Sequence, residues 1–155
     1  MKKLFWDTAE LDARAVSEFG LSTEVLMQNA ANALANVVRT RFKKSSTKRG
    51  KILGVVGSGN NGADVLAALR LLGGKFDCFA FLASDKQNET SKTELTRALK
   101  CGVNLISNLT ESGEFDCIID GIFGTGLSRE LDERTINLIN LLNAKPGYKL
   151  ACDIP

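Results

Sequence analysis

Short apolar runs alternate with amphipathic stretches over most of the chain, from Lys51 to the C-terminus. The runs predict five strands, at residues 52–56, 76–83, 103–106, 115–119 and 149–153. Strands that are continuously apolar, rather than alternating, are typical of a parallel sheet covered on both faces. The stretches between them repeat apolar residues at helical spacing and predict helices at 63–72, 89–100 and 132–143. This order predicts an α/β fold and argues against an antiparallel sandwich.

Two further helices are predicted before the first strand. The first covers residues 7–19, where Asp7 and Glu10 could form a capping box and Gly20 could end the helix. The second starts near Ser22 and is followed by a polar linker at 43–50. We therefore expect a three-layer α/β/α, Rossmann-like fold with a mainly parallel sheet. The N-terminal helical pair should pack on this sheet or on a partner subunit.

Composition narrows the range of partners. The 155 residues suit one domain, and a net charge of +2 implies no special electrostatic partner. The most basic stretch, at 39–49, has no interleaved aromatic residues, which favours a solvated linker over a nucleic-acid-binding arm. No apolar run approaches the length of a membrane span. The expected partners include neither nucleic acid nor a membrane.

The chain contains no histidine, so the commonest general base and metal ligand are absent. Its four cysteines form no C-x-x-C pair, which gives no support to a zinc or thioredoxin-type site. Three of them lie in predicted strands, as small apolar residues of a protein from the reducing cytosol would. We expect a cytoplasmic protein. The four are Cys78, Cys101, Cys117 and Cys152.

A glycine-rich segment follows the first predicted strand and opens a helix. Gly57, Gly59 and Gly62 satisfy G-x-G-x-x-G, the dinucleotide-binding pattern, in which a helix N-terminus receives phosphate. A glycine turn that merely enters a helix remains the alternative. The second strand does not end on the acidic residue usual in dehydrogenases, because Asp85 comes late. The adjacent Asn60 and Asn61 suit a hard cation or a polar ligand.

Two more predicted strand ends carry carboxylates. Asp120 closes the fourth strand, where a bound cation, a helix N-terminus or a cap of a short turn could satisfy it. The loop after it has Gly124 and Gly126 for close approach to a ligand, and Arg129 for a phosphate or a surface salt bridge. Asp153 follows the last strand.

Parallel strands can bring these ends together at one edge of the sheet. The resulting cluster would be rich in oxygen and lie beside a glycine-lined pocket. It would suit a monovalent or divalent cation and a phosphate-bearing ligand, with one carboxylate left for acid–base work. Its members would be Asn60, Asn61, Asp64, Asp120 and Asp153.

Four linked motifs resemble the YjeF N-terminal family. GSGNNGAD, DGIFGTGLSRE and ACDIP occur in the family's order and near its spacing, and LMQNAA at 26–31 is similar to the family's LMENAG. The resemblance implies an NAD(P)H-hydrate epimerase, an isomerase that interconverts the epimers of hydrated NADH and NADPH (NADHX and NADPHX). A companion dehydratase then restores the cofactor, and in many bacteria it shares the polypeptide.

The resemblance also implies roles for individual residues. Asn61 and Asp120 would hold a potassium ion, and Asp153 would bind near the nicotinamide ring and act as the acid–base residue. A chemically reasonable route expels the ring hydroxyl as water and adds it again from the other face, with proton transfer in each half. The substrate contacts would be Asn60, Asn61, Gly62, Ala63, Asp64, Gly124, Thr125, Gly126, Leu127, Ser128, Arg129, Glu130 and Asp153.

The chain departs from the family pattern in two respects. Where the family usually reads NNGGDG, this sequence has Ala63 and Val65 at glycine positions, and a methyl group at 63 could crowd the ligand. The family also continues DIP with a serine that helps to hold the cation. We therefore expect residues 1–155 to form an epimerase domain that is truncated at its C-terminal end, with little activity alone and an open sheet edge that favours self-association.

Three functions remain in competition. An epimerase is favoured, and the enzyme is expected to be a homo-oligomer. A non-catalytic ligand-binding or dimerisation module of the same type is the first alternative, favoured by the two replaced glycines and opposed by the retained Asn and Asp residues. A NAD-binding oxidoreductase, resting on the glycine pattern, is the second.

Overall fold

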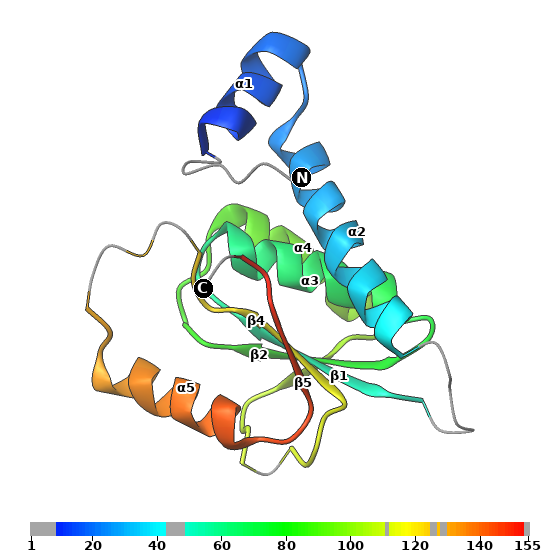
Figure 1. Cartoon of the computed structure of the whole chain (residues 1–155), viewed down its shortest axis with the longest axis vertical. Helices are drawn as coiled ribbons and strands as arrows, with labels where there is room; N and C mark the ends of the chain where they lie inside the picture. Colours follow the sequence, from blue (N-terminus) through cyan, green and yellow to red (C-terminus); the bar gives the residue numbers. More distant parts are fainter. Residues whose placement is uncertain (1–8, 43–48, 111, 125–126, 128–129, 154–155) are drawn as a thin grey trace, which may run out of the picture.

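Five parallel strands form the centre of the protein (Figure 1). The computed structural model describes residues 9–42, 49–110, 112–124, 127 and 130–153. The sheet order is β3-β2-β1-β4-β5, and every neighbouring pair is parallel. The chain fills one side of β1 first and then the other, so the order reverses between β1 and β4. The strands are β1 (Lys51–Val56), β2 (Asp77–Leu82), β3 (Asn104–Ile106), β4 (Cys117–Gly121) and β5 (Tyr148–Ala151).

Helices cover both faces of this sheet, which confirms the predicted three-layer α/β/α class. In Figure 1, α3 and α4 lie on one face with α2 crossing them, and α5 lies on the other. The N-terminal pair differs from the prediction in one respect, because α2 packs mainly on α3, and α1 extends away from the rest. The helices are α1 (Ala9–Phe19), α2 (Thr23–Arg41), α3 (Asn60–Leu72), α4 (Glu89–Lys100) and α5 (Glu133–Ala144).

The central position of β1 in the sheet explains the unbroken apolar run from Ile52 to Val56. Ile52 and Val56 belong to the core beneath α2, α3 and α4, whereas Leu53 and Val55 belong to the core beneath α5. Successive side chains of a strand point to opposite faces, so burial on both faces requires an unbroken apolar run.

Several boundaries differ from the predicted ones, and three of these lie beside the predicted site at the carboxyl edge of the sheet. Helix α3 begins at Asn60 rather than at 63, because Gly59 serves as its N-cap and the two asparagines already form its first turn. Strand β4 extends to Gly121, because Asp120 pairs with Val55 on one side and with Ala151 on the other. Strand β5 ends at Ala151, which leaves Asp153 beyond it.

Local capping signals account for several helix ends. Gly20 adopts a positive φ of 67° directly after α1, as its place in the sequence predicted. The Ser22 hydroxyl accepts a hydrogen bond from the Val25 N–H at the start of α2, and the Asp132 carboxylate caps α5 through the Thr135 N–H. Asp7, proposed to cap the first helix, lies outside the described residues. No helix in the described part of the chain has the length and apolarity needed to cross a membrane.

Candidate active site

The glycine loop between β1 and α3 packs directly on the end of β4. The Gly57 N–H donates a hydrogen bond to the Gly121 carbonyl at 3.0 Å, and a Cβ atom at Gly57 would lie 2.6 Å from that oxygen. A Cβ atom at Gly62 would collide with the Gly57 carbonyl. These two glycines are therefore required by the approach of one backbone to another. A Cβ atom at Gly59 would meet no described atom within 4 Å, so packing does not explain this third glycine.

Asn60 and Asn61 lie in the first turn of α3, and each is held by a neighbour. The Asn61 side-chain amide nitrogen donates to the Phe123 carbonyl at 2.8 Å. The Asn60 Oδ1 accepts from the amide nitrogen of Asn88, the N-cap of α4, at 3.0 Å. The bond to Phe123 leaves Oδ1 of Asn61 as the atom that could meet a cation or a ligand.

Three of the predicted site residues converge at one point. A Cβ atom built on Gly124 would lie 2.6 Å from Oδ2 of Asp153 and still closer to Nδ2 of Asn61. These residues come from α3, from the loop after β4 and from the segment after β5. The absence of a side chain at position 124 thus lets Asp153 and Asn61 approach the same space.

Asp64 lies one helical turn after Asn61 and is partly buried. Burial raises its pKa from 3.8 to about 6, and the negative charges of Asp153 and Asp12 add to this effect. Cys152 contacts the same region, with its Sγ atom 3.7 Å from the Asn61 carbonyl oxygen and 4.0 Å from Oδ2 of Asp64. Burial, together with the surrounding carboxylates, raises the pKa of Cys152 to about 12, so this thiol stays protonated at neutral pH.

Asp120 is more exposed than the sequence suggested. Its Oδ1 atom accepts a hydrogen bond from the Ile122 N–H at 3.0 Å, which is the turn-capping alternative considered for this residue. The backbone carbonyl of Asp120 accepts from the Cys152 N–H at 2.8 Å and so fixes the exit of β5.

An oxygen-ligated cation is compatible with this arrangement. The amide oxygen of Asn61 and the carboxylate of Asp120 are oxygen donors, which suit a hard cation. The Asn61 backbone lies against Gly121, the residue after Asp120, because a Cβ atom at Gly121 would be 2.9 Å from the Asn61 carbonyl oxygen. Within the described residues, no three His, Cys, Asp or Glu side chains come together as a metal site, so a cation here would depend on amide and backbone oxygens as well.

Ala63 and Val65, which stand where the family usually has glycine, contact different parts of the structure. Val65 is fully buried, and its methyl groups occupy the space beside Gly54 and Gly121, 2.6 Å and 2.5 Å from the Cβ positions of these glycines. This valine therefore fills the core between α3 and the sheet. Ala63 is also buried, but it lines a cavity.

That cavity has a volume of about 890 Å³ and lies between the N-terminal helices, α3 and α4. Asn60, Ala63 and Asp64 form its α3 wall. The facing residues were not singled out from the sequence, because they belong to helices whose role as site walls depends on how they pack. They are Asp12, Ala13 and Val16 of α1; Ser22, Thr23, Glu24, Leu26, Met27 and Ala30 at and within α2; and Glu89, Thr90, Thr93, Glu94 and Arg97 of α4.

The loop after β4, whose residues 124–130 are predicted substrate contacts, is described only in part. The Leu127 N–H donates to the Gly124 carbonyl at 3.1 Å, and both Leu127 and Glu130 are exposed. Thr125, Gly126, Ser128 and Arg129 lie outside the described residues, as does Pro155. Their proposed contacts, and the expected truncation of the domain, stay predictions.

Comparison with known proteins finds one matching family and relatives with names of related activities. A family model described as YjeF-related protein N-terminus matches residues 23–155. A protein of Oenococcus oeni named NAD(P)H-hydrate epimerase is 30% identical over 147 residues, which cover 93% of this chain and 69% of that protein. A bifunctional NAD(P)H-hydrate repair enzyme Nnr of Archaeoglobus fulgidus is 36% identical over 137 residues, 88% of this chain.

The chain matches only 28% of the length of the Archaeoglobus fulgidus enzyme. Among solved structures, a yeast protein described as ynu0, YNL200c has a TM-score of 0.80. The match covers 96% of this chain and 68% of the yeast chain at 24% sequence identity, and it supports the fold.

Proposed function

We propose that this chain, which belongs to the family of YjeF-related protein N-termini, is an NAD(P)H-hydrate epimerase acting on NADHX and NADPHX. The observation that carries the proposal is the convergence of Asn61, Gly124 and Asp153 at the carboxyl edge of the sheet. This edge lies where the strand order reverses, the usual ligand position in open α/β sheets. The Oenococcus oeni relative named an epimerase supports the same activity.

In this proposal the substrate's phosphates lie at the N-terminus of α3. A helix start carries unpaired N–H groups and a partial positive charge, which favour an anion. Among the described residues, no side chain caps α3 at Gly59. The Gly59 position is open as well, so a phosphate could approach the backbone there.

Asn61 and Asp120 would hold a potassium ion. When bound, such an ion would offset the negative charge of the dinucleotide phosphates. The hydrogen bond from Asn61 to Phe123 supports this role, because it turns the amide oxygen away from the Phe123 carbonyl.

Asp153 would carry the proton transfers. A carboxyl group beside the ring gives its proton to the departing hydroxyl, which leaves as water when the ring C–O bond breaks. The resulting carboxylate then takes a proton from the water that adds to the opposite face. Placement within reach of the ring is the main requirement for such catalysis, and the approach of both Asp153 and Asn61 to the space beside Gly124 supports it.

An ordinary oxidoreductase is less well supported. Dinucleotide-binding dehydrogenases place an acidic side chain at the end of β2 for the ribose. Here β2 ends at Leu82, and Asp85 is an exposed residue that pairs with Arg134 at 3.7 Å. The non-catalytic alternative is weakened too, since Val65 is accommodated by the core.

The proposal extends to partners and location. A dehydratase domain in the same polypeptide would match the bifunctional relatives. Self-association through α1 is favoured by its exposed apolar side chains, among which Phe19 is 73% exposed. A cytoplasmic location is part of the proposal, and the four unpaired cysteines are compatible with it.

The test is an epimerisation assay. Purified protein is incubated with one separated epimer of NADPHX, and the appearance of the other is followed by chromatography against an enzyme-free control, because the substrate epimerises spontaneously. We expect a rate above the control that falls to the control in Asp153→Asn. Asp77→Asn, at a partly exposed carboxylate where β2 begins, serves as the matched control. A wild-type rate equal to the enzyme-free rate would refute the proposed function, and an active Asp153→Asn would remove Asp153 from the mechanism.

A further inference from the structure

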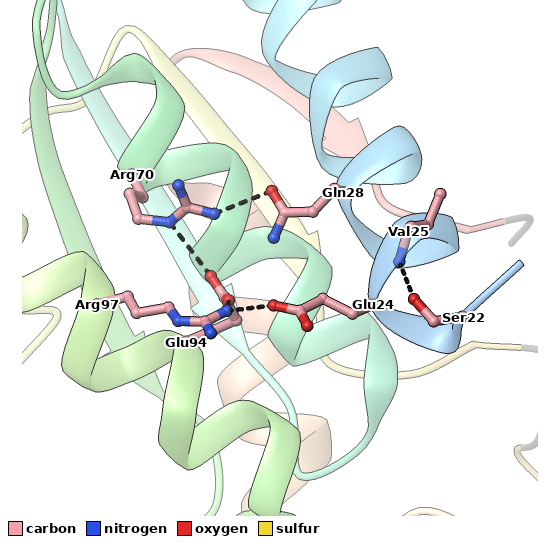
Figure 2. A network of polar contacts seen from close by, with 7 residues as sticks. All are labelled: Ser22, Glu24, Val25, Gln28, Arg70, Glu94 and Arg97. Carbon is pink, nitrogen blue, oxygen red and sulfur yellow. Dashed lines mark hydrogen bonds and ion pairs between the residues drawn. The ribbon is translucent and has the colours of Figure 1, made fainter.

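Glu94 is a fully buried carboxylate at the junction of three helices. Its side chain is 0% exposed, and α4 directs it between α3 and α2 (Figure 2). Oε2 accepts a hydrogen bond from Nε of Arg70 on α3 at 3.3 Å. Oε1 accepts from the guanidinium of Arg97, one turn later on α4, at 2.6 Å. Each carboxylate oxygen therefore meets a different arginine.

The two arginines also form hydrogen bonds with side chains of α2. The Arg70 guanidinium donates to Oε1 of Gln28 at 2.9 Å, and the Arg97 guanidinium donates to Oε1 of Glu24 at 2.7 Å. Glu24 and Gln28 are four residues apart, so they occupy the same face of α2. In Figure 2 the two arginines bridge the gap between Glu94 and this face. The charges balance, with two guanidinium groups facing two carboxylates.

Stability alone does not account for such a network. Taking a carboxylate out of water is costly, and apolar residues of similar volume often stabilise a protein as well as a buried ion pair does. The network does fix the relative position of the helices, however. The Glu94 carboxylate accepts from two guanidinium groups, and both hydrogen bonds form only at one relative placement of the helices. An apolar contact tolerates sliding of one helix along another far better.

The same helices form the walls of the cavity beside the candidate site. The cavity has a volume of about 890 Å³. Leu26, Met27 and Ala30 line it from α2, and Asn60 and Asp64 line it from α3. The first turn of α4 is tied to the glycine loop, because the Ser91 hydroxyl donates to the Gly59 carbonyl at 3.1 Å and the Asn88 N–H donates to the Ser58 carbonyl at 3.2 Å. Helix α4 is thus attached to the glycine loop at one end, and to α2 directly through Arg97 and indirectly through Glu94 and Arg70.

We propose that Glu94 is a positioning residue, which with Arg70 and Arg97 holds α2 at a set distance from Asn60 and Asp64 and so determines the width of the substrate cavity. This inference rests on the proposed function, since it assumes that the cavity admits part of the dinucleotide. Removal of the charge should let α2 shift relative to α3 without disturbing the sheet. Glu94 and Arg97 also line the cavity, whereas Arg70 and Gln28 do not. Weaker ligand binding in a variant of Gln28 would therefore reflect a displaced wall and not a lost contact.

The experiment compares wild type with Glu94→Gln, which keeps the shape of the side chain and removes its charge. Hydrogen exchange measured by mass spectrometry reports on α2, and NADPH, the unhydrated parent of the proposed substrate, serves as the fluorescent ligand. In Glu94→Gln we expect faster hydrogen exchange in α2 and unchanged exchange in β1. We also expect the dissociation constant for NADPH to rise roughly tenfold, which corresponds to a loss of about 1.4 kcal/mol in binding free energy. Glu18→Gln, which removes the exposed pair with Arg14, is the matched control.

A second variant separates positioning from packing. Arg70→Met with Glu94→Met replaces a buried ion pair by apolar side chains, and we expect it to regain the denaturation midpoint without regaining NADPH affinity. Gln28→Leu breaks the link between Arg70 and α2, leaves the link between Arg97 and Glu24, and carries the test if Glu94→Gln does not fold. Unaltered α2 exchange, or wild-type NADPH affinity in the double variant, would overturn the proposal. Because exchange and NADPH binding need no turnover, a wild type without epimerase activity would refute the proposed function and leave this test intact.

Discussion

The Asn61 side chain donates a hydrogen bond to the carbonyl oxygen of Phe123 at 2.8 Å, across 62 positions of sequence. This bond joins the first turn of α3 to the loop that leaves β4. It also sets the orientation of an amide whose oxygen is proposed to meet potassium. This hydrogen bond thus connects the α3 part of the candidate site to the part that follows β4. A substitution of Asn61 should therefore alter both parts.

Asn61→Asp should remove that connection. A carboxylate has no N–H to donate, so the Phe123 carbonyl loses its partner, and a negative charge is added beside Asp153. We expect a stability loss of about 1–3 kcal/mol in urea unfolding, the usual cost of an unsatisfied polar group. Epimerase activity should also fall. Asn140→Asp, an exposed substitution in α5, should change neither quantity, and a fully active Asn61→Asp would argue against the proposed role of the amide.

Gly124→Ala should disturb the site while leaving the fold intact. The added methyl group would lie 2.6 Å from Oδ2 of Asp153 and closer still to the Asn61 amide, so at least one of these side chains must move. We expect activity to fall by at least about tenfold, because misplacement of reacting groups by a fraction of an ångström to 1 Å is costly. Gly74→Ala is the matched control, since a Cβ atom there meets nothing within 4 Å. Equal activities in the two variants would contradict the convergence described above.

The raised pKa of Asp64 leads to a prediction about pH. The folded carboxyl group holds its proton up to a pH of about 6, whereas the unfolded chain releases it near 3.8. Between these values the folded state binds more protons, so this residue lowers the stability of the fold as the pH rises through that window. Asp64→Asn removes the effect, and its urea midpoint should rise relative to wild type between pH 4 and pH 7.

The control for this measurement has the opposite expectation. Asp77→Asn loses an exposed ion pair with Arg49 at 3.3 Å and should be equal to wild type or slightly less stable at neutral pH. If Asp64→Asn gains nothing over wild type above pH 6, burial of this carboxylate has little consequence.

Val65→Gly should lower the free energy of unfolding, because Val65 fills core space although the family usually has glycine at this position. The valine is fully buried, with methyl groups beside Gly54 and Gly121. Its loss leaves a void and adds a glycine inside a helix, which together should cost about 2–4 kcal/mol in unfolding free energy. Val37→Gly, at a position 42% exposed in α2, should cost only the helix-propensity part, about 1 kcal/mol or less. Similar costs at the two positions would mean that Val65 does not fill the core as described.

Much of the fold follows from local patterns. Backbone hydrogen bonding imposes periods of two and 3.6 residues, so apolar runs and amphipathic stretches identify strands and helices directly. All five predicted strands and all three helices after Lys51 are present, although their ends move by up to three residues. Gly57 and Gly62 lie in the predicted turn from a strand into a helix, and close backbone packing excludes a side chain at both positions. The approach of a phosphate to this loop stays a prediction.

The site required tertiary structure, because its members come from distant segments. The sequence placed Asn61, Gly124 and Asp153 at strand ends, but only the packed sheet shows that position 124 lies between the other two. Asp120 was expected to need a buried partner. It is exposed and accepts the Ile122 N–H, an arrangement set by the pairing of β4 with β1 and β5.

Glu94 marks the limit of sequence reasoning most clearly. Its spacing with Ser91 and Ala98 places it on the inward face of α4, yet a glutamate in a polar helix is ordinarily solvent-exposed. Burial of a carboxylate depends on its partners, and only one of them can be read from local sequence. Arg97 lies three residues later on the same helix, but Arg70 belongs to α3, and only the packing of α3 on α4 brings it to Glu94. The sequence by itself determined the layers and the glycine loop, since these depend on local periodicity and steric limits. Tertiary structure decided which distant charges and amides face one another, because helix and strand packing brings them within bonding distance.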